Sequence, residues 1–291
     1  MRLKNSGNYD KKVNIPHYLD KGGNYVLQYT KQAISTKFLK DGIVKISGVE
    51  TTVKTDKKDI CQVRIVPKTS TFVIEVVYSI PDVEFMSKNN RFAGCDLGIE
   101  NLATIGSNVE QGIIIKGTPL KSINQFCNEQ VAKERSELIT RQEPRKARGE
   151  KISYTAKHID KLWEKRGNLI SDYMHKASSL IVDYLTKNQI SVLVIGRTKG
   201  WKQEVNIGKM NNQNFCFIPH YKFLLMIKYK AEKLGIQVLE QEESYTSKCS
   251  FLDNESCCEK ETYAGKRIIR GLFKTASGLV VNADWNATTG T

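Results

Sequence analysis

Asp96 is the first residue of this chain whose position needs a chemical explanation. It follows residues 92–95, a short apolar run that predicts a buried strand, and it precedes a predicted turn at 97–101 and a return strand at 102–105. An ionised carboxylate buried without a partner costs several kcal/mol, so this side chain must face either a cation or water. Two interpretations are open: a divalent-metal ligand on a hairpin, or an aspartate that caps a tight turn.

The composition of the chain is strongly basic. Its 291 residues (33.0 kDa) contain 45 Lys and Arg against 31 Asp and Glu, which leaves a formal net charge of +14 and a pI near 9.3. Such an excess favours a polyanionic partner, usually nucleic acid, although a solvated basic surface has the same composition. The length is sufficient for two domains, or for one domain with a large insertion.

The hydropathy of the chain predicts no contact with a membrane. No window holds the ~18 apolar residues of a membrane span, and the N-terminus lacks the apolar core of a signal peptide. We therefore expect a cytoplasmic protein. The seven cysteines, mostly placed within apolar runs, predict reduced core thiols rather than a disulfide framework.

Residues 1–90 are predicted to form a small β-rich domain. Short β-branched runs at 42–50, 61–67 and 71–78 are separated by polar stretches that carry many lysines. Those lysines suit contact with a phosphate backbone, but they would also keep any β-domain soluble. Periodicity is lost at 80–90, which we take as the boundary to a second domain at residues 91–291.

The second domain contains a predicted helical insertion. After a third strand at 112–117, the apolar residues follow a helical period, and we place the insertion at about 119–189 with a break at 142–149. A basic elbow at this break could contact a duplex backbone, although a solvated loop is the commoner explanation. Its candidate nucleic-acid contacts are Arg141, Arg145, Lys146 and Arg148.

The remaining elements complete the order of an α/β sheet. Residues 191–195 are apolar throughout, which predicts a central strand parallel to a neighbour. A helix is predicted from Pro219 to about Leu234, and a fifth strand at 236–243. The resulting order of three strands, helix, strand, helix and strand is that of an RNase H-like sheet, but many α/β domains share it. The basic loop after the fourth strand adds four candidate nucleic-acid contacts, Arg197, Lys199, Trp201 and Lys202.

Four blocks of the sequence resemble successive motifs of the TnpB (OrfB) family of insertion-sequence proteins. They lie at residues 94–104, 243–248, 265–273 and 282–287. That family consists of RNA-guided DNA endonucleases, long described as transposases, and it is related to the compact type V CRISPR effectors. The resemblance implies a RuvC-type, RNase H-like nuclease domain with a long helical insertion, preceded by a β-rich wedge-like domain. It also implies guide RNA and target DNA as partners.

The same resemblance implies a magnesium site. In the family the first and last blocks supply two metal-binding aspartates, which match Asp96 and Asp284 here. Two Mg²⁺ ions about 4 Å apart, held by three or four carboxylates, activate a water and stabilise the leaving oxygen of a phosphodiester. A third carboxylate ligand is therefore expected.

The third carboxylate is where the sequence departs from the family pattern. The fourth strand of most members ends with the catalytic Glu, whereas this strand is followed by Gly196. The block at 194–203 resembles lineages in which the Glu has moved, and we expect Glu243 to replace it, with Glu242 as the next choice. Strand alternation allows only one of these two to face Asp96. More distant alternatives are Glu204 and Glu100.

Two further departures concern zinc and length. The family usually carries two Cys-x-x-Cys pairs that form a tetrahedral zinc site, but the stretch at about 249–277 has no such pair, so structural zinc is not expected. The sequence ends seven residues after Asp284, and we expect a truncated member of the family. The stretch resembles a degenerate zinc finger, and the candidate nucleic-acid contacts in and beside it are Lys248, Lys266, Arg267 and Arg270.

Two functional hypotheses follow from these observations. The first is a Mg²⁺-dependent, RNA-guided DNA endonuclease linked to transposition, whose catalytic metal ligands are Asp96, Glu243 and Asp284. The second is a nuclease-dead relative that binds guide RNA and DNA without cutting, because of Gly196 and the short C-terminus. A plain RNA-binding protein would instead require the two aspartates to lie apart. The oligomeric state is left open.

Overall fold

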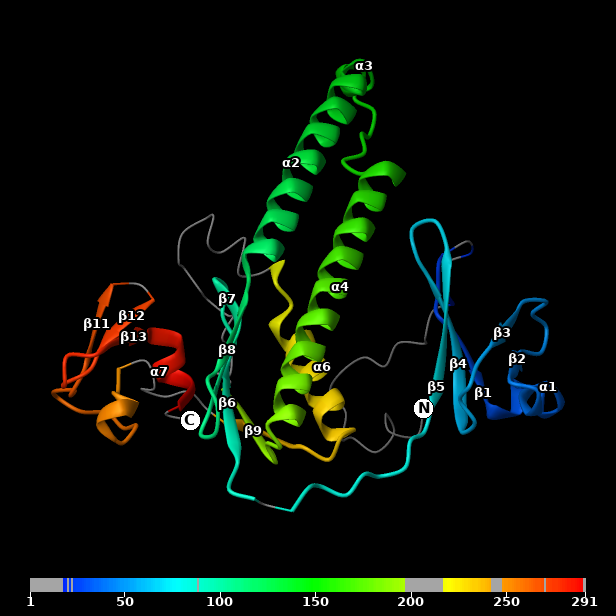
Figure 1. Cartoon of the computed structure of the whole chain (residues 1–291). Coiled ribbons are helices and arrows are strands. Elements are labelled where there is room, and N and C mark those ends of the chain that lie inside the picture. The colour runs from blue at the N-terminus through cyan, green and yellow to red at the C-terminus, as the bar shows by residue number, and fades with distance from the viewer. Residues whose placement is uncertain are drawn as a thin grey trace, which may run out of the picture. The chain divides into compact units, whose positions relative to one another are not determined.

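The structure, a computed structural model, describes residues 18–19, 21, 23–87, 89–196, 217–241, 248–269 and 271–289. The chain divides into two compact units, Met1–Ile80 and Pro81–Thr291 (Figure 1). The division falls at the start of the segment in which sequence periodicity is lost. Within the described ranges, no helix has the length and apolar character needed to cross a membrane.

The first unit consists mainly of short antiparallel strands. One sheet has the order β1-β4-β5, and a separate pair is formed by β2 and β3. A short helix and a 3-10 turn precede that pair. The elements are β1 (Leu27–Thr30), η1 (Lys31–Ala33), α1 (Thr36–Lys40), β2 (Ile43–Lys45), β3 (Thr52–Lys54), β4 (Ile60–Pro67) and β5 (Phe72–Tyr78).

Strand β2 is shorter than the run at 42–50 predicted. Burial alternates along the strand as in a half-buried sheet, because Val44 and Ile46 are buried while Lys45 between them is exposed. The strand ends early because Gly48 has a φ of +74°, a conformation that favours glycine, and the chain turns there. The backbone N–H of Val49 then donates to Ile46 O at 3.3 Å, which closes the turn.

The second unit is built on a mixed five-stranded sheet. The strand order is β10-β9-β6-β7-β8: the first three strands in sequence are antiparallel, and β9 is parallel to both β6 and β10. The prediction of a central parallel strand at 191–195 is therefore confirmed. The strands are β6 (Phe92–Asp96), β7 (Asn101–Ser107), β8 (Ile113–Lys116), β9 (Val192–Gly196) and β10 (Gln237–Gln241).

Three helices, α2 to α4, lie within the range predicted for the helical insertion, and the long helices together with α6 cover one face of the sheet. The helices α2 and α4 form a hairpin whose tip, at α3, extends away from the sheet, and the other end of α4 packs with α6 (Figure 1). Side chains such as Met174, Ile181 and Phe223 pack with Ala93 and Cys95 in one core. The helices are α2 (Thr118–Arg141), α3 (Glu143–Ala147), α4 (Lys157–Lys187) and α6 (His220–Glu232).

Two apolar residues expected in the core are exposed. Phe92 was predicted to be buried in β6, but its side chain is 50% exposed. Neighbouring strand residues point to opposite faces, so Phe92 does not share the face on which Ala93 contacts the helices. Leu180 belongs to the helical apolar period of the insertion, which predicts burial, but it is 59% exposed, whereas Ile181 is buried.

The cysteine prediction is correct for only part of the described chain. All six described cysteines are free thiols. Cys95, Cys127 and Cys249 are buried as predicted. The others, which lie on solvent-facing strand or loop positions rather than in the core, are Cys61, Cys257 and Cys258.

A small antiparallel sheet and a short helix complete the second unit. The sheet has the order β11-β12-β13, and the following helix α7 packs against β6 and β7 of the large sheet. This arrangement brings the C-terminal segment to the strand that carries Asp96. The elements are η2 (Phe251–Asp253), β11 (Lys266–Ile269), β12 (Leu272–Lys274), β13 (Val280–Asn282) and α7 (Ala283–Thr289).

Candidate metal site and nucleic-acid interface

Asp96 is the last residue of β6, the middle strand of the large sheet. It pairs with Thr104 of β7, and directly opposite residues of an antiparallel pair share one face. Helix α7 packs over these two strands, so Asp96 is only partly exposed. The carboxylate therefore lies at a sheet end, in contact with a second element.

Helix α7 carries the second aspartate and begins at a side-chain cap. Asn282 Oδ1 accepts hydrogen bonds from the backbone N–H groups of Asp284 (2.9 Å) and Trp285 (3.1 Å), which is the usual role of an N-cap residue. Asn286 then anchors the helix, because its Nδ2 donates to Cys249 O at 2.8 Å. Asp284 is thereby held in the first turn of a fixed helix.

The structure brings Asp96 and Asp284 together. The pKa of Asp96 is raised from 3.8 to about 6, first by burial and then by the negative charge of Asp284. The guanidinium of Arg267 opposes this rise, and its Nη2 lies 3.7 Å from Asp284 Oδ1. Two carboxylates that repel each other at a partly buried site form an arrangement that a cation would stabilise.

A hydroxyl group lies beside this carboxylate pair. Thr104, opposite Asp96, is 1% exposed, and its Oγ1 has no hydrogen-bond partner within the part of the chain that the structure describes. Buried hydroxyl groups are normally paired. The Thr104 Oγ1 atom can therefore bind a ligand or a water next to Asp96.

Two residues of this site were missed by sequence reasoning. Asn101 Nδ2 donates to Asp284 Oδ2 at 2.8 Å, and Lys116 Nζ donates to Asn101 Oδ1 at 3.1 Å. Asn101 lies within the block at 94–104, but only as a polar residue at the start of an apolar strand. No spacing in the sequence indicates that it contacts Asp284.

The position expected for a third carboxylate is occupied by a glycine. Gly196 ends β9 one residue after Ile195, which pairs with Cys95, and Gly196 itself pairs with Gln241 at the end of β10. Strand β10 therefore ends at Gln241, at the same end of the sheet as Asp96. The predicted ligand and two of its alternatives lie outside the described residues: Glu243, Glu242 and Glu204.

Glu100, the remaining alternative, behaves as a surface residue. It is exposed and forms an ion pair with Lys121 of α2. Across the described ranges, no three His, Cys, Asp or Glu side chains converge as a metal-binding group. The donors that do converge are carboxylate and hydroxyl oxygens, which are the ligand type that Mg²⁺ prefers.

The basic elbow at the tip of the helical hairpin is partly neutralised. Arg145 and Arg148 both bind Glu150, with N–O distances of 2.9 and 2.7 Å. Arg141 pairs with Glu137 at 3.1 Å. Lys146, at the same tip, is exposed and forms no ion pair with a carboxylate of the described residues.

The other predicted nucleic-acid contacts fall into two groups. Lys266 and Arg267 lie on exposed positions of β11, and Lys248 Nζ lies 5.8 Å from the centre of the Tyr263 ring. Arg267 is also the residue beside Asp284. The contacts that lie outside the described residues are Arg197, Lys199, Trp201, Lys202 and Arg270.

In the stretch at about 249–277, the carboxylate of Glu255 accepts several hydrogen bonds. Glu255 accepts hydrogen bonds from the backbone N–H of Ser250 (2.8 Å) and of Ala264 (3.2 Å), and from Lys260 Nζ (3.2 Å). Cys249 is buried nearby, and its Sγ lies 3.5 Å from Ser256 O. Hydrogen bonds to Glu255 thus link residue 250 to residues 260 and 264.

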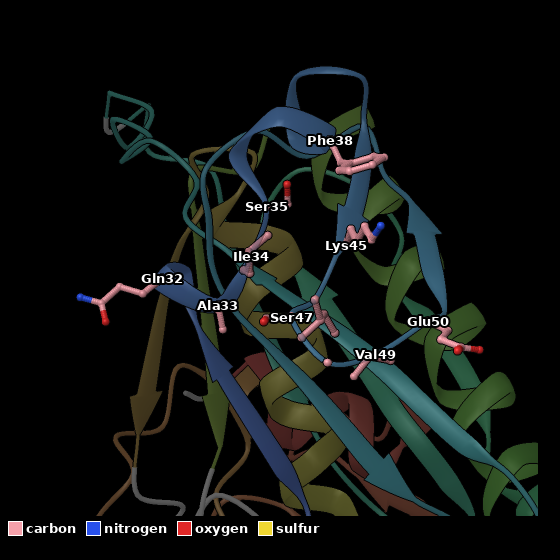
Figure 2. A pocket seen from close by; sticks show the side chains of 11 residues that line it. Gln32, Ala33, Ile34, Ser35, Phe38, Lys45, Ser47, Val49 and Glu50 are labelled. Carbon is pink, nitrogen blue, oxygen red and sulfur yellow. The ribbon is translucent and has the colours of Figure 1, made fainter.

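The first unit has a hollow of about 860 Å³ beside α1 and β2 (Figure 2). Ser35 and Ser47 line it, and Lys45 Nζ lies 4.6 Å from the centre of the Phe38 ring. An aromatic ring and a cation on one open surface are chemically suited to a base and a phosphate.

Comparison with known proteins identifies the class of the chain. Residues 75–202 match the OrfB_IS605 family model, described as "Probable transposase". Residues 220–290 match the model of the Cas12f1-like TNB domain. The first match contains Asp96 and the second contains Asp284. The predicted resemblance is therefore confirmed: the chain is a relative of the OrfB (TnpB) and Cas12f1 proteins.

Individual relatives agree with this class. Over 133 residues the chain is 32% identical to the CRISPR-associated endodeoxyribonuclease Cas12f1 of Sulfoacidibacillus thermotolerans. The aligned residues are 45% of this chain and 28% of that protein. A chain in the cryo-EM structure of the Cas12f1–sgRNA–target DNA complex has a similar fold, with a TM-score of 0.56 at 16% identity. That likeness covers 79% of this chain and 45% of the other. The chain thus spans less than half the length of these relatives.

Proposed function

We propose that the second unit is a RuvC-type, RNase H-like nuclease domain and that the protein is a Mg²⁺-dependent, RNA-guided DNA endonuclease of the TnpB type. One observation carries this proposal: Asp96 and Asp284, 188 positions apart in the sequence, meet at the end of the middle strand of a mixed sheet. Two antiparallel hairpins followed by two parallel strands is the order expected of an RNase H-like sheet. The kinship with OrfB and Cas12f1 proteins supports the same function.

The residues of the chain would bind and orient the reacting groups. When bound, Mg²⁺ supplies charge neutralisation and an activated water for phosphodiester hydrolysis. Asp96 and Asp284 would hold the ions, with Glu243 as the proposed third ligand. Metal binding requires an ionised Asp96. Because the pKa of Asp96 is about 6, its carboxylate is mostly ionised at pH 7, and metal binding should weaken as the pH falls below 6. Thr104 Oγ1 would orient a water beside Asp96.

The nucleic-acid partners are part of the proposal. The net charge of +14 and the exposed cations of the helical tip and β11 suit a guide RNA and a target DNA. The β-rich first unit would act as a wedge-like domain, with the hollow beside Phe38 facing nucleic acid. One structural relative, Cas12f1, was determined in complex with an sgRNA and a target DNA.

The test is cleavage of a plasmid that matches a supplied guide RNA, in the presence of Mg²⁺. We expect the wild-type protein to cut and Asp96→Ala to lose cutting by several orders of magnitude. Asp172→Ala is the matched control, because Asp172 is an exposed aspartate that forms an ion pair with Lys176 on the same helix. Equal cutting by wild type and Asp96→Ala would refute the proposal.

A second candidate function is binding without cleavage. It is favoured by Gly196, which puts no carboxylate at the strand end beside Asp96. In that case the wild-type protein would retain guide-dependent binding to matched DNA but produce no cut product. Binding measured by electrophoretic mobility shift in the same Mg²⁺ buffer separates this function from an inactive preparation.

A further inference from the structure

A chain of side-chain hydrogen bonds leads from β8 to Asp284. Asn101 is 8% exposed, and its Nδ2 donates to Asp284 Oδ2 at 2.8 Å. Its Oδ1 accepts from Lys116 Nζ at 3.1 Å. The amide therefore bridges a lysine and one of the two converging carboxylates.

The chemistry of lysine decides which way this amide faces. A lysine ammonium group has three donors and no acceptor, so only the carbonyl oxygen of Asn101 can face Lys116. The amide nitrogen must then face Asp284, where it donates to an acceptor-only carboxylate. The reversed amide would place its oxygen against Asp284 and its nitrogen against the ammonium group, and both contacts would be repulsive.

The backbone holds both ends of this bridge. Asn101 and Lys116 are directly opposite each other in the β7–β8 pair. The backbone N–H of Gly117 donates to Glu100 O at 2.7 Å, and Tyr173 Oη donates to Lys116 O at 2.6 Å. A Cβ at Gly117 would lie 2.0 Å from Ile99 O, so the two strands approach closely at this end. The Lys116 and Asn101 side chains thus start from fixed positions.

We propose that Asn101 is a positioning residue for Asp284 and that Lys116 sets the direction of its amide. Asp284 Oδ2 accepts the hydrogen bond from Asn101. This leaves Oδ1, which lies 3.7 Å from Arg267 Nη2, as the oxygen that would bind a divalent cation. This inference rests on the proposed function, since it assigns Asn101 and Lys116 to the metal site. Groups that orient metal ligands in this way typically contribute 10–100-fold to metal affinity.

The first test is Mn²⁺ binding to the full chain, measured by titration calorimetry. We expect Asn101→Ala to weaken binding by about 10- to 100-fold. Lys116→Glu, which replaces donors with acceptors and favours the reversed amide, should weaken binding in the same direction. Lys116→Arg keeps only donors and should retain affinity close to that of the wild type.

A matched control separates orientation from charge. Lys121→Glu makes the same change of charge beside Glu100, one residue from Asn101, without a contact to the Asn101 amide. The inference requires Lys116→Glu to weaken Mn²⁺ binding clearly more than Lys121→Glu does. Equal effects of the two variants would overturn it. If Asn101→Ala does not fold, the comparison of Lys116→Glu, Lys116→Arg and Lys121→Glu decides alone.

Two further variants distinguish failure of this inference from failure of the proposed function. Asp96→Asn and Asp284→Asn remove the metal ligands themselves. If neither variant changes Mn²⁺ binding, the proposed metal site is wrong and this inference falls with it. If both weaken binding while Asn101→Ala matches the wild type, the metal site stands and the role of Asn101 is refuted.

Discussion

Asp96, a proposed metal ligand, destabilises the folded chain when it is ionised and no cation is bound. Its carboxylate is partly buried and lies close to the charge of Asp284, and both effects raise its pKa to about 6. Arg267 offsets part of this repulsion. In a protein without divalent cations, an ionised Asp96 is therefore less stable in the folded chain than in the unfolded chain.

This imbalance predicts a pH-dependent stability that Asp96→Asn removes. Near pH 4 Asp96 is protonated in the folded chain and still about half protonated in the unfolded chain, so wild type and variant should differ little in stability. Between pH 4 and pH 6 the folded chain holds a proton on Asp96 that the unfolded chain has lost, so the stability of the wild type falls relative to the variant as the pH rises. Above pH 6 the wild type should be less stable than Asp96→Asn by up to about 3 kcal/mol. Chemical denaturation with chelator at pH 4 and pH 8 measures this, with Asp172→Asn as control. A variant no more stable than wild type at pH 8 would contradict it.

At the scale of elements, α7 and the helical hairpin depend on a few polar contacts. Helix α7 is short, so its own hydrogen bonds cannot hold Asp284 in place. Asn282 starts the helix and Asn286 ties it to the segment near Cys249. In the hairpin, Arg166 of α4 lies against the Trp163 and Phe217 rings and binds Asn124 of α2.

Loss of the cap of α7 should lower both stability and metal binding. Asn282→Ala removes the acceptor for two backbone N–H groups, which should cost about 1 kcal/mol of unfolding free energy. Asn282→Ser keeps a capping oxygen and should stay close to the wild type. Thermal unfolding and Mn²⁺ titration of both variants check this expectation. Equal Mn²⁺ affinity for Ala and Ser at this position would show that the cap does not position Asp284.

Replacement of Arg166 by lysine should loosen the base of the hairpin. Its Nε donates to Asn124 Oδ1 at 2.7 Å and its Nη2 to Phe217 O at 3.0 Å, and a lysine cannot make both bonds while it stacks on a ring. We expect Arg166→Lys to cost about 1–3 kcal/mol, because the buried Asn124 and the partly buried Phe217 lose hydrogen bonds. Arg141→Lys at an exposed ion pair is the control. An unchanged denaturation midpoint for Arg166→Lys would argue against this anchor.

At the scale of the whole molecule, part of the basic charge is already paired with carboxylates of the chain. The formal charge of +14 suits a polyanionic partner, but Glu150 occupies two arginines at the helical tip. These two bonds also lower the pKa of the Glu150 carboxyl. The number of free cations at the tip is thus smaller than the sequence suggests.

The proposed contact of the tip with nucleic acid can be measured through its salt dependence. Lys146→Ala should weaken RNA binding and reduce the slope of log K against log salt by about 0.7 to 0.9, the contribution of one phosphate contact. Glu150→Gln should strengthen binding, because it releases Arg145 and Arg148. Fluorescence anisotropy with a labelled RNA hairpin at several KCl concentrations gives both slopes. Wild-type slopes in both variants would place the RNA elsewhere.

The sequence by itself predicted the strands of the large sheet and the long helices, and it singled out Asp96 and Asp284. Strands β6 and β9 and the long helices follow from hydrophobic periodicity, which depends only on neighbouring residues. The motifs around Asp96 and Asp284 indicated the kinship that the comparisons confirm. The predicted helix end at about Leu234 is followed by Gly235, whose φ of +77° suits a glycine cap.

Only the tertiary structure decided which side chains meet. Asn101 and Asp284 are 183 residues apart, and their contact requires both the β7–β8 register and the packing of α7 on the sheet. The exposure of Phe92 likewise depends on which sheet face the helices cover. Such contacts arise from distant parts of the chain folding against one another, so no local spacing of residues encodes them.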